Sequence, residues 1–147
     1  MTPYVRRFIR SSLFWLGVGV VLGVLMAAWP RATLYRPAHM HANLLGFVSM
    51  MIFGVAYHVI PRFTGAALRS ERVASLHLVV ANVGLGGMVL AWLARAHGAA
   101  WWQPVLVAGG TLSALGAFLF IWNLWRTLDA APKPFVGLAQ SQPPARR

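Results

Sequence analysis

Four long apolar runs divide this sequence, and short polar segments separate them. The runs cover about residues 13–29, 41–60, 73–94 and 105–125. Each is close to the roughly 20 residues with which an α-helix crosses about 30 Å of hydrocarbon. Prolines mark the ends of the runs, where a missing N–H costs a helix little: Pro30, Pro37, Pro61 and Pro104. The pattern predicts an all-α fold, an integral membrane bundle of four helices.

The composition agrees with a membrane domain, since 59% of the 147 residues are hydrophobic and only 10% are charged. A soluble domain normally carries about a quarter charged residues. We expect one transmembrane domain over residues 1–130, followed by a flexible cytoplasmic tail over 131–147. The first run is expected to be a retained signal anchor, because Trp29, Pro30 and Arg31 follow it in place of a small-residue cleavage pattern.

The formal charge of +11 comes from 13 basic residues against Glu71 and Asp129. No basic stripe alternates with exposed aromatics, so membrane orientation explains this charge better than nucleic-acid binding does. With both termini in the cytoplasm, the outer side holds only Arg31, Arg36 and Arg95. The cytoplasmic side then holds Arg6, Arg7, Arg10, Arg62, Arg69, Arg72, Arg126, Lys133, Arg146 and Arg147. This bias predicts the orientation with both termini inside, and we expect a multi-pass protein of the bacterial inner (cytoplasmic) membrane.

All five histidines fall near the predicted helix ends. His41 and His58 are 17 residues apart, which is about 25 Å along a helix, so they lie at opposite surfaces. The third span returns outward, which places His77 near the depth of His58. His39, His41 and His97 form the outer group, and His58 and His77 form the inner group.

Neutral imidazole is the usual protein ligand of haem iron, copper and zinc. Two imidazoles at one depth on facing helices can hold a haem b, so His58 and His77 could bind one haem, and His41 with His97 another. A lone histidine near a membrane interface is more often a solvated or helix-capping residue than a ligand, and we favour this interpretation for His97. For the inner pair both readings stay open. His39 and His41 lie together at the start of a span, where burying an imidazole ring without a ligand is costly. Copper is the alternative metal for this pair.

Other residues narrow the chemistry. Arg36 stands against the charge bias and suits a haem propionate, because arginine pairs with carboxylates. The absence of cysteine excludes thiolate metal sites, c-type haem attachment and iron–sulfur clusters held by this chain alone. No acidic residue lies in a span, which argues against a proton pump or cation-coupled transporter. No catalytic residue is predicted, because no nucleophile–base constellation and no nucleotide-binding motif is present.

The second span resembles a known family. The stretch from residue 35 to 65, YRPAHMHANLLGFVSMMIFGVAYHVIPRFTG, is similar to the second transmembrane helix of haem–copper oxidase subunit I, above all in the nitric oxide reductase and cbb3-type branches. The residues that match are His41, Asn43, Leu44, Tyr57 and Pro61. The resemblance implies that His41 is an axial ligand of a low-spin haem b, with the second ligand from a local residue or another chain. The stretch also resembles NnrS, a membrane haem and copper protein.

These observations favour a haem b membrane subunit that passes electrons between a quinone or periplasmic cytochrome and a larger redox complex, or within a homo-oligomer. One or two haems are expected, with His41 as the first ligand. An NnrS-like haem or copper protein linked to nitric oxide metabolism is the alternative. A cofactor-free structural subunit is the third class, and an absorption spectrum separates the three.

The charge bias makes a prediction about topology. Reporter fusions at residue 35 and after residue 98 should report the periplasm, and fusions after residues 66 and 130 should report the cytoplasm. A periplasmic signal from the fusion after residue 130 would contradict the four-span topology and the depth matching of the histidines.

Overall fold

The computed structural model describes residues 1–132 and is helical, with no strand in that range. The elements are α1 (Pro3–Ala28), η1 (Pro30–Tyr35), α2 (Arg36–His41), η2 (Ala42–Ser49), α3 (Met50–Thr64), α4 (Glu71–Ala96) and α5 (Trp102–Asp129). Four helices are long and apolar enough to cross a membrane: Pro3–Ala28, Pro30–Thr64, Glu71–Ala96 and Trp102–Asp129. The predicted all-α fold with four membrane-spanning helices is confirmed. Of the predicted tail, residues 133–147 lie outside the described part.

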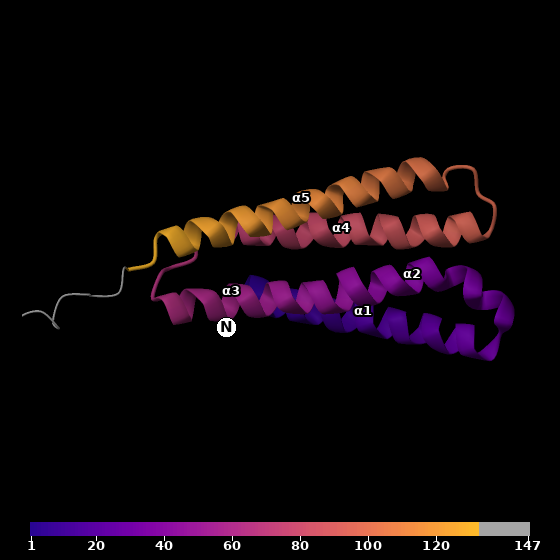
Figure 1. Cartoon of the computed structure of the whole chain (residues 1–147), viewed down its shortest axis with the longest axis horizontal. Coiled ribbons are helices and arrows are strands. Elements are labelled where there is room, and N and C mark those ends of the chain that lie inside the picture. The colour runs from indigo at the N-terminus through magenta and orange to yellow at the C-terminus, as the bar shows by residue number, and fades with distance from the viewer. Residues whose placement is uncertain (133–147) are drawn as a thin grey trace, which may run out of the picture.

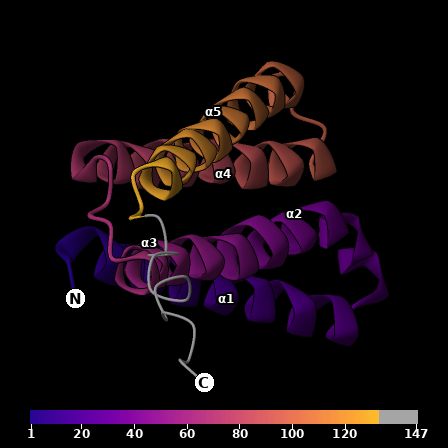
Figure 2. The same ribbon diagram turned by 60° about the vertical axis from the view of Figure 1, so that its left-hand side comes forward.

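The helices form two antiparallel pairs, as Figures 1 and 2 show. In one pair α1 lies beside the long second span, which is built from α2, η2 and α3. In the other pair α4 lies beside α5, which crosses it at an angle. The link between the pairs leaves α3 at Gly65, whose positive φ of 67° suits a residue without a side chain. It enters α4 at Ser70, whose hydroxyl accepts the amide of Val73 at 3.2 Å.

The second span departs from a regular α-helix directly after His41. The segment Ala42–Ser49 is a π-helix, in which the hydroxyl of Ser49 donates to the carbonyl of Leu44, five residues earlier. Wider turns of this kind are rare, and they are often found at functional sites. The segment changes the rotation of every later residue in the span, so the faces of α3 do not follow from counting 3.6 residues per turn.

Hydrogen bonds between helices tie the bundle together. In α4, the Oδ1 atom of Asn82 accepts from the hydroxyl of Ser11 at 2.5 Å and from the indole N–H of Trp15 at 3.1 Å, which joins α4 to α1. In α5, Asn123 donates to the carbonyl of Ser70 at 2.8 Å and accepts its amide at 3.0 Å. The second contact fixes the start of α4 against α5.

Backbone approach sets the packing of α4 on α5. A Cβ atom added at Gly84 would lie 2.6 Å from the amide nitrogen of Ser113 and 2.8 Å from the carbonyl oxygen of Gly109. These neighbours are backbone atoms and cannot turn away. Small residues at such crossings let membrane helices come close enough to pack.

This crossing gives a stability prediction with a control in the same helix. Gly84→Ala should lower the free energy of unfolding in mixed micelles by about 1–3 kcal/mol, because the helices must move apart. Gly86→Ala should change it by less than about 0.5 kcal/mol, since a Cβ at Gly86 meets nothing within 4 Å. Equal effects of the two substitutions would show that the close contact between α4 and α5 at Gly84 does not determine stability.

Candidate functional site

His41 is the last residue of α2, and one of its two ring nitrogens makes a hydrogen bond. Its Nδ1 lies 2.7 Å from the carbonyl oxygen of Pro37. A carbonyl only accepts, so Nδ1 carries the proton and the neutral ring keeps its lone pair on Nε2. The Nε2 atom makes no hydrogen bond within the described residues. A pocket of about 230 Å³ lies beside the ring and is lined by Met40, His41, Leu44 and Leu45. His41 therefore offers a free ligand atom next to an apolar surface.

Basic and aromatic side chains from α4 and α5 gather next to His41. The ring of Trp92 lies 5.9 Å from the ring of His41. The guanidinium of Arg95 lies 5.2 Å from the centre of Trp92 and 4.9 Å from that of Trp102, which is cation–π packing. Arg36, Pro37, Trp92 and Arg95 together line a pocket of about 410 Å³. Pro37 and Trp92, which contact His41, line this pocket together with Arg36 and Arg95.

The other two outer histidines are turned to other partners. His39 donates from Nδ1 to the carbonyl of Gly19 in α1, at 2.8 Å. Because His39 and His41 are two residues apart on a helix, their side chains leave it about 200° apart. His97 caps α4, and its Nε2 lies 2.9 Å from the hydroxyl of Tyr35. The structure does not bring these three rings together.

His77 lies in an aromatic cage near the other end of the bundle. The ring is fully buried among Phe8, Phe53, Tyr57 and Phe120, whose ring centres lie 4.7–5.9 Å away. Its Nδ1 lies 3.2 Å from the hydroxyl of Tyr57, and its Nε2 is buried without a partner in the described residues. Two residues of α3 contact His77: Tyr57 through this hydrogen bond and Phe53 through its ring.

His58 is not among the side chains around His77. It follows Tyr57 by one residue, and about 100° of helix rotation turns it away. Arg62 donates from Nη1 to the Nδ1 of His58 at 2.9 Å and to its carbonyl oxygen at 2.6 Å. A guanidinium has no acceptor, so this Nδ1 holds a lone pair that the arginine already uses. In this arrangement His58 and His77 share a depth but not a site, and their ligation of one haem stays a prediction.

The residues present fit one face of a haem at His41. The imidazole has a free Nε2, and the hydrogen bond from Nδ1 fixes its tautomer. Histidines that bind haem or metal ions are commonly oriented in this way, by a hydrogen bond from the nitrogen that does not bind the metal. Leu44 and Leu45 supply an apolar wall, and Arg36 with Arg95 suits carboxylates. Within residues 1–132 no group of three or more His, Asp or Glu side chains could hold a metal ion.

Sequence reasoning missed part of this environment. It placed Arg95 only among the outer basic residues and gave Trp92 and Tyr57 no role at a site. Trp92 and Arg95 are three residues apart, a spacing that puts them on one helix face. The contact of Trp92 with His41, however, depends on how α4 packs on α2, which a single helix does not reveal.

Comparison with known proteins connects this chain to the oxidases. No protein-family model matches the sequence. The chain is 25% identical to the Cbb3-type cytochrome c oxidase subunit CcoN1 of Stutzerimonas stutzeri, over 92% of this chain and 35% of that protein. It is 32% identical to a putative cytochrome c oxidase subunit 1-beta of Streptomyces coelicolor, over 75% of this chain and 22% of the relative. The chain is 26% identical to cytochrome c oxidase subunit 1 of Rhodobacter capsulatus, over 89% of this chain and 30% of that protein.

These similarities confirm the resemblance to haem–copper oxidase subunit I, at 25–32% identity over most of this chain. The chain spans between about a fifth and a third of the length of these relatives. Together with the four spans, the relatives show a multi-pass membrane protein of bacterial type.

Proposed function

We propose that this chain is a haem b-binding subunit that passes electrons within a respiratory-type complex of the bacterial inner membrane. The observation that carries the proposal is the hydrogen bond of His41 to Pro37, which leaves Nε2 free beside an apolar surface. The similarity to oxidase subunits supports it, because those relatives are named as parts of redox complexes.

When bound, a haem supplies a one-electron couple whose potential the protein sets by ligation and burial. His41 holds its ring through the carbonyl of Pro37 and through contact with Trp92. Arg36 and Arg95 would meet the propionates, and Leu44 and Leu45 keep water from one face. No residue is assigned to bond-making chemistry, so the chain acts as an electron-transfer subunit.

The described residues offer no second imidazole beside His41. The second axial ligand therefore comes from another subunit of the complex or from another copy of this chain. The electron partners that we propose are a quinone, which dissolves in the bilayer, or a periplasmic cytochrome.

The test is reconstitution of the purified full chain with haemin. The wild-type protein should bind haem and show a shifted Soret band, and added imidazole should convert it to a six-coordinate spectrum by filling the missing position. His41→Ala should weaken haem binding by more than about tenfold, because the ligand is lost.

His58→Ala is the matched control, because His58 is bonded to Arg62 and should leave haem binding unchanged. Circular dichroism confirms that both variants keep their helices. Equal haem binding by His41→Ala and the wild type would refute the role of His41, and loss in His58→Ala alone would move the haem to the inner pair. A wild-type protein that binds no haem would refute the function.

A further inference from the structure

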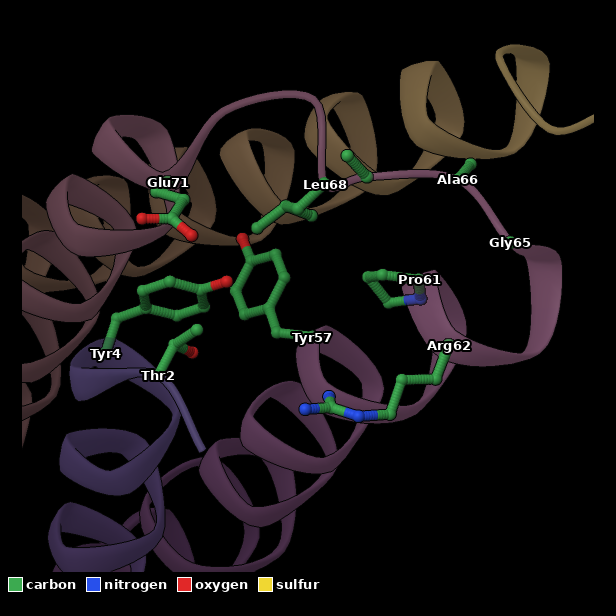
Figure 3. Close-up of a pocket in the computed structure, with 10 residues that line it drawn as sticks. Thr2, Tyr4, Tyr57, Pro61, Arg62, Gly65, Ala66, Leu68 and Glu71 are labelled. Carbon is green, nitrogen blue, oxygen red and sulfur yellow. The ribbon is translucent and has the colours of Figure 1, made fainter.

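A second pocket lies at the end of the bundle away from His41. It encloses about 510 Å³ where α3 ends and α4 begins. Figure 3 shows it as a space bounded by the start of α1, the end of α3 and the link to α4. The residues that matter for its chemistry are Thr2, Tyr4, Tyr57, Pro61, Arg62 and Glu71.

The polar groups of this pocket are hydroxyls with hydrogen-bonding capacity to spare. The Oγ1 atom of Thr2 is buried and has no partner in the described residues. It does not cap α1, so the helix does not explain it. The hydroxyl of Tyr57 meets Nδ1 of His77 at 3.2 Å. When Nδ1 of His77 carries the proton and donates to the phenol oxygen, the O–H of Tyr57 stays free to donate to a ligand.

The walls between these hydroxyls are flat and apolar. Tyr4 and Tyr57 stand nearly perpendicular, with ring centres 6.0 Å apart. The ring of Pro61 faces them across the pocket in Figure 3. Aromatic rings favour such edge and offset contacts with another flat ring. The space therefore suits a planar ring with oxygen atoms at its edge.

The two charged residues of the pocket have opposite signs. Arg62 donates to His58 through Nη1 alone and keeps its positive charge, and the carboxylate of Glu71 lines the same pocket. One guanidinium and one carboxylate leave the lining with no excess charge of either sign, which suits a neutral ligand.

We propose that this pocket binds the head group of a membrane quinone. Its carbonyl oxygens would accept from the hydroxyls of Thr2 and Tyr57, its ring would lie against Tyr4 and Pro61, and its tail would leave toward the bilayer. The inference rests on the proposed function, which names a quinone as an electron partner, and adds the site where that partner would bind; quinone binding at this pocket is measured separately from haem binding at His41.

The experiment titrates decylubiquinone into the purified full chain in detergent micelles, followed by isothermal titration calorimetry. The wild type should bind about one quinone with a saturable signal. Tyr57→Phe should weaken binding about fivefold, which is the loss of one neutral hydrogen bond. Thr2→Val should weaken it by a similar factor, and because Thr2 caps nothing, this variant tests the pocket without disturbing the cage of His77.

Tyr35→Phe is the matched control, since Tyr35 is at the other end and bonds His97. It should leave quinone affinity unchanged, and titrated phosphatidylglycerol should not displace the quinone. The inference is overturned if binding does not saturate, if Tyr57→Phe and Thr2→Val both retain wild-type affinity, if Tyr35→Phe weakens binding equally, or if phosphatidylglycerol competes. None of these results changes the haem reconstitution, so the two proposals fail separately.

Discussion

Hydrocarbon offers no hydrogen bonds, and this constraint governs the whole protein. Every backbone polar group in a span must find its partner inside the chain, which leaves the helix as the available form. Polar side chains must then bond to one another or to carbonyls, as Asn82 does with Ser11 and Trp15. The histidines obey the same rule, and which nitrogen each one has left over decides what it can do.

The five histidines differ in their hydrogen-bond partners. His39, His77 and His97 bond groups on other elements, namely Gly19, Tyr57 and Tyr35. His58 accepts from Arg62, one turn later in the same helix. His41 bonds a carbonyl of its own helix through Nδ1, which leaves the lone pair of Nε2 without a hydrogen-bond partner in the described residues. The π-helical segment begins at the next residue, so the irregular stretch of backbone and the free imidazole coincide.

The two ends of the bundle differ in their chemistry. The His41 end combines a free imidazole nitrogen with Arg95, which stacks on two tryptophans, and with Arg36 in the neighbouring pocket. The pocket at the opposite end is lined by hydroxyls, by Arg62 and by the carboxylate of Glu71, and the caged His77 lies next to Tyr57 of its lining. The two ends therefore differ in the groups that they offer a ligand: a free imidazole nitrogen at one end, and hydroxyls with a balanced pair of charges at the other.

The sequence by itself determined the helical class, the four spans and the relation to oxidase subunits, because the lengths of apolar runs and the residues around His41 are local features. The depths of the histidines in a membrane, which helix rise predicts, stay a prediction. Only the tertiary structure decided which rings meet. Tyr57 faces His77 in place of His58, and Trp92, with Arg95 stacked on it, packs beside His41. The physical reason is that contact depends on helix rotation and crossing, which the π-helical turn and the glycine approach of α4 to α5 set, and one residue of rotation exchanges one neighbour for another.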